Sequence, residues 1–305
     1  MLGRMVGEEL ASARASALVA PEVVEIAREA DLLVLNLECC IAEQGTPRPK
    51  VFTFRAPPAA VDLLVHLGVD CVTLANNHAL DYGPDALAET LERLSAAGIA
   101  AVGAGASVEE ARCAAVLEAD GGRLAVLGAG DHPEDFAAGT ARPGIAYADF
   151  ERGVPTWLVE TIWATQSDAV LVTPHWGPNM TSAPLAYVRA AARELRAAGA
   201  TLVAGHSAHV FHGVAPGILF DLGDFLDDYA VDPGLRNNLG LLFLVDLRHR
   251  GVERIEAVPL KLEYCFTRLA RGEEAAWIRR RFARACADLG TSVKEESGRL
   301  VVEFA

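Results

Sequence analysis

Short runs of valine and leucine alternate with amphipathic helical segments along most of this chain, and this alternation limits its fold more than any other feature. Strands that are buried on both faces of a parallel sheet have this apolar character, and the helices between them cover the sheet. We therefore predict an α/β fold. The helical patterns lie at residues 21–27, 59–67, 84–97 and 185–198, and the apolar runs at 32–37, 70–74, 99–102, 124–127, 169–173 and 201–204.

The last third of the chain has a different pattern. Two alternating apolar segments, 241–247 and 253–260, predict a pair of antiparallel strands. Residues 273–305 predict a solvated helix and a final strand. The longest stretch without a periodic pattern is 128–155, which we interpret as a lid or an insertion.

The composition limits the classes of partner. Of the 305 residues, 51% are apolar and 22% are charged, which favours one domain with a large core and appendages over disorder. The net charge of -14 argues against nucleic acid and anionic membrane as partners, because both require a cationic face. We expect a small-molecule or peptide substrate, and the oligomeric state stays open.

The cysteines and the N-terminal residues predict a compartment. The six cysteines lack the paired spacing of zinc or redox motifs, and a chain of this length does not need disulfides. No apolar run approaches the roughly 20 residues that span a bilayer. Residues 1–10 lack the pattern of a secretory signal. The prediction is a cytoplasmic protein with reduced thiols.

Polar side chains follow four of the apolar runs at the points where the predicted strands end. These are Glu38, Asn77 with its neighbour His78, His175, and His206. In open α/β sheets, ligands bind beyond the carboxyl ends of the strands. Carboxylate, carboxamide and imidazole groups are metal ligands. The sequence therefore predicts a metal or acid–base site at this edge of a sheet.

Two of these strand ends carry further candidates. Residues 205–212, Gly-His-Ser-Ala-His-Val-Phe-His, bring His206, His209 and His212 close together, and His212 is the weakest of the three as a ligand. Residues 174–179, Pro-His-Trp-Gly-Pro-Asn, place Trp176 and Asn179 beside His175, where they can contact a substrate.

Acid–base partners are also present. Asp81 can hold one ring nitrogen of His78 while the other moves protons. Asp131 and His132, in the irregular stretch, form a second candidate pair. Arg55, framed by aromatic residues and prolines, can grip a carboxylate or a phosphate, although a surface ion pair is at least as good an interpretation.

Five motifs in this order resemble those of the CapA-type poly-γ-glutamate capsule synthesis family, which is related to the calcineurin-like metallophosphatases. The resemblance covers residues 1 to about 260. The motifs are Asn-Leu-Glu at 36–38, Ala-Asn-Asn-His at 75–78 with Asp81, His-Trp-Gly at 175–177, Gly-His-Ser-Ala-His-Val at 205–210, and Asp-Leu-Gly-Asp-Phe at 221–225.

The resemblance implies a four-layer α/β/β/α metallophosphatase-like sandwich. We expect it to occupy residues 1–270, with residues 271–305 as an appendage of one helix and one strand. It further implies a proton-donating role for His78. The metal ligands that it implies are Glu38, Asn77, His175, His206 and His209.

The chain departs from the family in two places. Family members have a strand ending in Gly-Asp, with a ligating aspartate, before the Met-Leu-Gly-Arg stretch that stands here at residues 1–4. We expect this strand to be missing here, and an upstream start would restore it. Secondly, Asp221 and Asp224 replace the more usual serine and asparagine, and we expect them near the substrate. Extra carboxylates favour one or two manganese, magnesium or calcium ions over zinc.

Three functions fit this reading. The first is hydrolysis of a phosphoester or an amide by a metal-activated water, with His78 as general acid. The second is metal-dependent epimerisation of a peptide, as in relatives that act on lasso peptides. Its acid–base candidates are His78, His132, His209, Asp131, Asp221 and Asp224. The third is a non-enzymatic part in poly-γ-glutamate synthesis.

Overall fold

A three-stranded parallel sheet forms from the first third of the chain. A computed structural model describes residues 1–12, 15–248 and 251–304. The sheet has the order β1-β4-β5, and Val34 lies opposite Cys71, which lies opposite Ala100. The elements are α1 (Arg4–Ser12), η1 (Ala15–Ala17), α2 (Pro21–Ala27), β1 (Val34–Asn36), β2 (Cys40–Ile41), β3 (Arg55–Ala56), α3 (Ala60–Leu67), β4 (Cys71–Thr73), α4 (Pro84–Ala96), β5 (Ala100–Val102), β6 (Ala104–Gly105) and α5 (Val108–Ala111).

A six-stranded sheet follows, in the order β12-β13-β11-β10-β8-β7. Its strands β8, β10, β11 and β13 are parallel to one another, and β7 and β12 are antiparallel to their neighbours. The elements are β7 (Ala115–Ala119), β8 (Gly122–Gly130), η2 (Glu134–Phe136), β9 (Gly144–Ile145), η3 (Phe150–Arg152), α6 (Thr156–Ala164), β10 (Ala169–His175), α7 (Ala186–Ala197), β11 (Leu202–Ala204), β12 (Val214–Ala215) and β13 (Ile218–Leu219).

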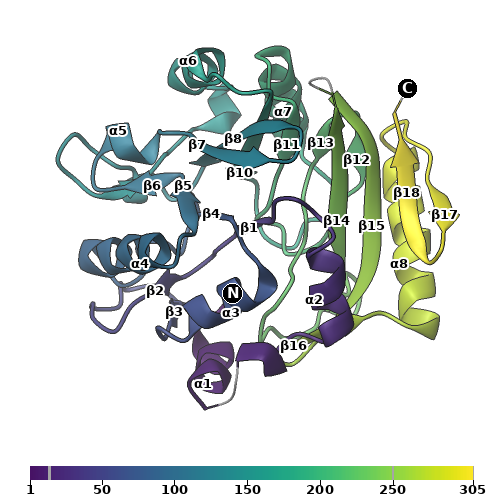
Figure 1. Cartoon of the computed structure of the whole chain (residues 1–305), viewed down its shortest axis with the longest axis horizontal. Helices are drawn as coiled ribbons and strands as arrows, with labels where there is room; N and C mark the ends of the chain where they lie inside the picture. The colour runs from purple at the N-terminus through teal and green to yellow at the C-terminus, as the bar shows by residue number, and fades with distance from the viewer. Residues whose placement is uncertain (13–14, 249–250, 305) are drawn as a thin grey trace.

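The C-terminal part forms an antiparallel sheet and one helix. The predicted strand pair is confirmed, because β14 (Leu239–Arg248) pairs with β15 (Gly251–Glu263). β16 (Phe266–Leu269) and β18 (Arg299–Glu303) also pair with β15, and β17 (Lys294–Glu296) pairs with β18. The predicted final helix is α8 (Gly272–Ala287). The last strand therefore belongs to the same sheet as β14 (Figure 1).

The alternation of side chains along the strands builds four layers. In β10, Val170 and Val172 pack toward α6 and α7, while Leu171 faces a core between the two main sheets. In β4, Val72 packs with α3 and α4, while Cys71 faces the same inter-sheet core. The order helix, sheet, sheet, helix confirms the predicted α/β/β/α sandwich (Figure 1).

Two expectations from the sequence need correction. Residues 128–155 are not one irregular insertion, because β8 continues to Gly130 and β9 pairs with β6. The apolar run 32–37 yields only the three-residue strand β1, since β4 is its single partner in the described residues. No helix in these described ranges is both long and apolar enough to cross a bilayer.

Candidate functional site

Two imidazoles from neighbouring parallel strands form the centre of a polar cluster. β10 ends at His175, and His206 follows β11. Their Nδ1 atoms are 2.7 Å apart, so only one of the two can carry the shared proton. Burial lowers the pKa of His175 well below its usual value and that of His206 to about 3. Both rings are therefore neutral at pH 7, which is the form that binds metals.

A chain of amide contacts joins the end of β1 to the end of β4. Asn76 Nδ2 donates to Asn36 Oδ1 and to the carbonyl of Leu37, at 2.9 Å in each case. Asn36 Nδ2 donates in turn to Glu38 Oε2 at 3.1 Å. The backbone N–H of His78 donates to Asn76 Oδ1 at 3.1 Å. These contacts fix the strand ends that carry Glu38 and His78.

His78 is held by a buried carboxylate, as the sequence predicted for this pair. Its Nδ1 lies 2.5 Å from Asp81 Oδ2, which also accepts from the Phe54 N–H at 2.8 Å. Lys50 Nζ contacts Asp81 Oδ1 at 2.6 Å and the carbonyl of Asn77 at 2.5 Å. The Nε2 atom of His78 is thus the ring nitrogen left for proton transfer. Sequence analysis missed Lys50, because it belongs to no local motif.

His209 forms a second imidazole–carboxylate pair. Its Nδ1 lies 2.9 Å from Asp224 Oδ1. Burial disfavours the charged ring, but the attraction of Asp224, with weaker help from Glu38 and Asp221, raises the pKa of His209 to about 10. The backbone at Ser207 (φ 132°) and His209 (φ 58°) has positive φ, which is uncommon for residues other than glycine and concentrates at functional sites.

Asp221 braces the loop that carries His209. Its carboxylate accepts from the N–H of Ala208 at 2.8 Å and from that of Gly223 at 2.9 Å. Burial raises the pKa of Asp221 to about 7, although these two hydrogen bonds oppose the shift. The side chain joins two loops of the cluster.

A third imidazole–carboxylate pair follows the end of β8. His132 Nδ1 contacts Asp131 Oδ1. Asp131 Oδ2 accepts from the Gly177 N–H and from the Tyr187 hydroxyl, at 3.1 Å in each case. The His132 ring centroid is 4.9 Å from that of His175. The pair therefore lies beside the central imidazoles, and Tyr187 is another residue that sequence analysis missed.

The predicted residues from different strands converge. The ring centroids of His206 and His132 each lie 4.9 Å from that of His175. After burial, His206, His132, His209 and His78 all lower the pKa of His175. Tyr229, which the sequence did not single out for a role, stacks edge-on to His209 with ring centroids 5.2 Å apart.

Two of the predicted substrate contacts, Trp176 and His212, lie in the core. Trp176 is buried and its Nε1 donates to the Phe220 carbonyl at 3.0 Å. His212 is buried, and its Nε2 donates to the Thr181 carbonyl at 2.9 Å. Asn179 is exposed on the loop that follows His175. The contacts of Trp176 and His212 are those of core residues.

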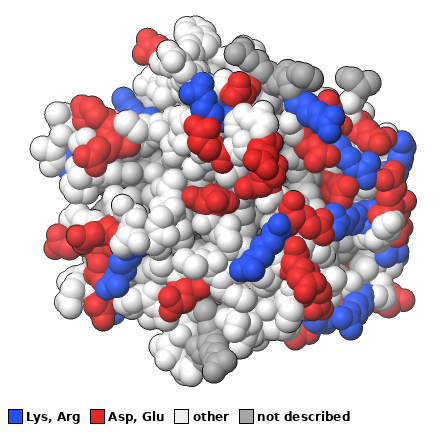
Figure 2. Space-filling model, in the orientation of Figure 1, with Lys and Arg blue, Asp and Glu red and all other residues white. Residues whose placement is uncertain are grey.

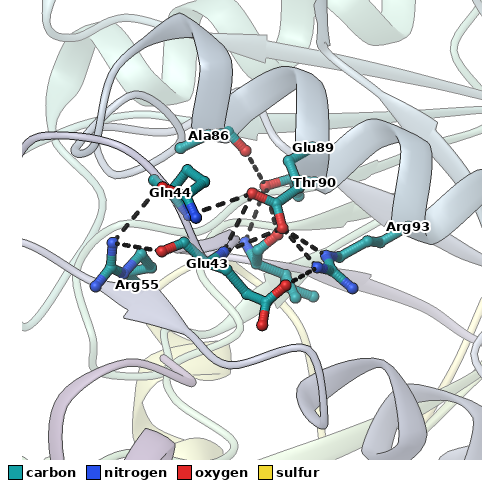
Figure 3. A network of polar contacts seen from close by, with 8 residues as sticks. Glu43, Gln44, Arg55, Ala86, Glu89, Thr90 and Arg93 are labelled. Atoms are coloured by element: carbon teal, nitrogen blue, oxygen red, sulfur yellow. Dashed lines mark hydrogen bonds and ion pairs between the residues drawn. The ribbon is translucent and has the colours of Figure 1, made fainter.

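Arg55 lies in a separate network (Figure 3). Its guanidinium donates to the carbonyls of Glu43 at 3.3 Å and Gln44 at 3.4 Å, and it stacks on Tyr82 at 4.5 Å from the ring centroid. Glu89 of α4 accepts from the N–H groups of the same two residues. These contacts tie the 43–44 turn to α4, and none joins Arg55 to the histidines.

The donor set fits a bound cation, although no preformed centre is present. Within residues 1–12, 15–248 and 251–304, no three His, Cys, Asp or Glu side chains are already arranged as a metal-binding group. An unpaired buried polar atom costs about 1–3 kcal/mol, so several in one cluster indicate a missing partner. The buried atoms of this cluster without a hydrogen-bond partner are Glu38 Oε1, Asn77 Oδ1, His175 Nε2 and Asp224 Oδ2.

Comparison with known proteins gives matches over most of the chain. The pattern of the family described as "Bacterial capsule synthesis protein PGA_cap" matches residues 1–229. A probable polyglutamine synthesis accessory protein of Mycobacterium tuberculosis is 30% identical over 284 residues, which cover 86% of this chain and 74% of that protein. The PGA biosynthesis protein CapA of Bacillus subtilis is 28% identical over 270 residues, covering 86% and 69% respectively. A crystal structure described as a novel phosphatase of Mycoplasma pneumoniae aligns over 80% of each chain, with 13% identity and a TM-score of 0.47.

Proposed function

Because the chain belongs to the bacterial capsule synthesis (PGA_cap) family, we propose that it is a metal-dependent hydrolase that cleaves a phosphoester or an amide with water. The observation that carries the proposal is the set of unpaired buried acceptors beside the two neutral imidazoles of His175 and His206. The names of the relatives concern polyglutamine synthesis and PGA biosynthesis. An amide of a glutamate polymer is therefore tested beside a phosphodiester.

Of the proposed metal ligands, Glu38, Asn77 and His175 each have a buried donor atom without a hydrogen-bond partner. His206 Nε2 lies 3.1 Å from Thr173 Oγ1, so His206 would exchange this contact for the cation. A bound divalent ion would lower the pKa of a water molecule and polarise the oxygen of the scissile group. Asp224 holds Nδ1 of His209 and favours the protonated ring, so a cation would have to displace the proton from Nε2 before this atom could ligate it. The carboxylates of Asp221 and Asp224 favour manganese, magnesium or calcium over zinc. The ligand set that we propose is Glu38, Asn77, His175, His206 and His209.

His78 supplies the proton to the leaving group in this proposal. Asp81 orients the ring through Nδ1, and Lys50 compensates the buried charge of Asp81. The proton is then delivered from Nε2. Glu38 follows β1, and Asn77 and His78 both follow β4. One amide network therefore fixes the positions of the proposed ligands and of the acid.

The test is turnover of bis-p-nitrophenyl phosphate and of a γ-glutamyl amide. We expect activity that EDTA abolishes and manganese restores, and a loss of at least about 100-fold in His206→Ala. His66→Ala, on helix α3 and outside the cluster, is the matched control. Full activity in EDTA, or parental turnover by His206→Ala, would contradict the proposal. Polymer synthesis at the parental level with the His206→Ala variant would instead support a non-enzymatic role.

Peptide epimerisation is the second candidate, and one observation favours it. The three pairs His78–Asp81, His209–Asp224 and His132–Asp131 all engage Nδ1 with a carboxylate. Each pair leaves Nε2 to remove or return a proton, which is the arrangement that two-base proton transfer at a Cα requires. Deuterium uptake at a peptide Cα in D2O supports this candidate, and hydrolysis without any exchange excludes it.

A further inference from the structure

The guanidinium of Arg4, on the first turn of helix α1, is held by three side chains. It lies over the rings of Phe52 and Phe54, at 5.5 Å and 5.6 Å from the two centroids. Its Nε lies 3.3 Å from Asp228 Oδ2, and among the residues that the structure describes this ion pair is the one polar contact of the Arg4 side chain. Aromatic faces and one carboxylate thus fix the guanidinium and leave both of its terminal nitrogens to bind a ligand.

The backbone around Arg4 is fixed as well. Helix α1 packs beside β3 (Figure 1). A Cβ atom on Gly3 would lie 2.9 Å from the Cα of Phe54, so this close approach requires glycine. The N–H of Met5 donates to Asp228 Oδ2 at 3.0 Å, and the Asp228 side chain is only 1% exposed. The carboxylate that anchors Arg4 is therefore itself held in the interior.

Two aromatic rings connect Arg4 to the histidine cluster. Phe54, under the guanidinium, packs edge-on against His78 with ring centroids 4.6 Å apart. Phe54 also packs edge-on against Tyr229 at 6.1 Å, and Tyr229 in turn contacts His209. Arg4 therefore lies one ring beyond the proposed proton donor. A group bound by Arg4 would belong to a part of the substrate near the scissile bond, and not to the scissile group itself.

Arg4 is also the most accessible member of this arrangement. Its side chain is 37% exposed, whereas those of His78 and His209 are 9% and 7% exposed. Acidic residues outnumber basic ones by 41 to 27, and Figure 2 shows acidic side chains spread over one face of the molecule. Because the net charge repels anions, recognition of an anionic substrate requires a fixed local cation.

Other cations on this side of the cluster are already engaged. Lys50 contacts Asp81 and the carbonyl of Asn77. Arg48 pairs with the side chain of Asp135. Arg55, which the sequence offered as a residue that grips a carboxylate, donates to two backbone carbonyls in a separate network. The free terminal nitrogens of Arg4 distinguish it from all three.

We propose that Arg4 is a specificity-determining residue that binds a carboxylate of the substrate. The inference rests on the proposed hydrolysis and narrows its substrate to an amide that carries a free carboxylate near the scissile bond. The two terminal nitrogens of a guanidinium match the two oxygens of a carboxylate, and a lysine ammonium cannot reproduce this paired geometry. Phe52, which is 58% exposed, adds an apolar surface beside the bound carboxylate.

The experiment compares two substrates on the manganese-loaded protein. These are γ-glutamyl-p-nitroanilide and the same compound with a carboxamide in place of its α-carboxylate. We expect the parent to have at least about a tenfold higher kcat/KM for the carboxylate form, because hydrogen bonds between charged groups are strong. Arg4→Gln should remove this preference and leave kcat/KM for the carboxamide form unchanged.

A second variant keeps the charge. Arg4→Gln leaves the buried Asp228 without its cation and should lower stability, whereas Arg4→Lys retains a cation there. We expect Arg4→Lys to keep about a threefold preference or less. The ratio of the two kcat/KM values does not depend on the fraction of folded protein. Arg48→Gln, an arginine that also lies over an aromatic ring, is the matched control and should keep the full preference.

Each remaining outcome decides between the two proposals. The parental preference in both Arg4 variants would overturn the role of Arg4, as would equal turnover of both amides by the parent. Hydrolysis of bis-p-nitrophenyl phosphate without hydrolysis of either amide would also overturn it, while metal-dependent hydrolysis itself would stand. A parent that turns over none of the three compounds would contradict the proposed function, and the role of Arg4 with it.

Discussion

At the scale of single residues, the cluster is organised by the way each histidine uses its two ring nitrogens. Three rings place Nδ1 on an aspartate, while His175 and His206 place Nδ1 against each other. The first arrangement orients a ring for proton transfer. The second, in a buried position, keeps both rings neutral. The same residue type therefore serves two kinds of chemistry within one site.

The role of His78 gives a prediction for a single substitution. In His78→Asn, we expect kcat to fall by about 10²–10⁴-fold, because the general acid is lost, while KM changes little. Asp81→Asn should lower kcat as well, and it should also destabilise the protein, since Lys50 then loses its buried partner. Steady-state kinetics and thermal unfolding of both variants separate the two effects. Parental kcat in His78→Asn would exclude the proton-donor role.

His212 gives a prediction for pH. Burial lowers the pKa of His212 to about 4 in the folded chain, whereas an unfolded histidine titrates near 6.5. As the pH falls through about 6.5, the unfolded chain therefore gains a proton that the folded chain does not. The stability contributed by neutral His212 decreases down to about pH 4, by about 3 kcal/mol at most.

The measurement is urea unfolding of the parent and of His212→Gln at pH 7.5 and pH 4.5. We expect the parent to lose more stability between the two values than the variant does, because only the parent has this imidazole. His66→Gln on α3 serves as the matched histidine control. An identical loss in the parent and His212→Gln would show that His212 does not titrate in this range.

At the scale of elements, helix α4 is fixed through Glu89 to residues 43–44, which follow β2 (Figure 3). Burial alone would raise the pKa of Glu89, but hydrogen bonds from Arg93 and from the N–H groups of Glu43 and Gln44 outweigh burial and lower this pKa. The stability that Glu89 contributes is therefore present above its unfolded pKa and is lost as the pH falls through the folded value.

We expect Glu89→Gln to destabilise the protein by about 1 kcal/mol at pH 7, because the amide is a weaker acceptor for these donors. Below about pH 4 the difference should shrink, as the parent carboxyl becomes protonated. Glu92→Gln, an exposed position on the same helix, is the control. Urea unfolding at pH 7 and pH 3.5 checks both values, and a difference that does not change with pH would contradict this account.

The burial pattern of each element explains which elements could be predicted from the sequence. The long periodic helices and the Val/Leu runs were predicted because burial on one or both faces leaves a pattern in the residues themselves. The two-residue strands β12 and β13 leave no such pattern, since their pairing depends on a neighbouring strand. The run at 32–37 predicted a longer strand than β1, because a sequence pattern does not report how many partners an edge has.

At the scale of the whole molecule, the candidate site could be predicted as a set of positions but not as a set of contacts. The strand-end rule brought Glu38, Asn77, His175 and His206 into one hypothesis. The rule does not identify Lys50, whose ammonium group reaches Asp81 from a loop 31 positions away. Nor does it place Arg55, because an arginine that stacks on Tyr82 has the same sequence context as one that binds a substrate.

The proposed ligands come from both main sheets, so metal binding should stabilise the whole molecule. Glu38 and Asn77 follow strands of the first sheet, while His175 ends one strand of the second sheet and His206 follows another. A ligand that binds only the folded state stabilises it by about 2.7 kcal/mol at 100 times its Kd. We therefore expect manganese to raise the Tm by several degrees and EDTA to reverse the rise.

His175→Ala should lose most of this shift, because it removes one of the unpaired buried nitrogens. His66→Ala should retain the shift, which separates loss of a ligand from a general effect of removing a histidine. Thermal unfolding with and without manganese measures both variants. An equal shift in His175→Ala and in the parent would mean that the cation binds elsewhere, because a site assembled from both sheets cannot keep its affinity after losing a central ligand.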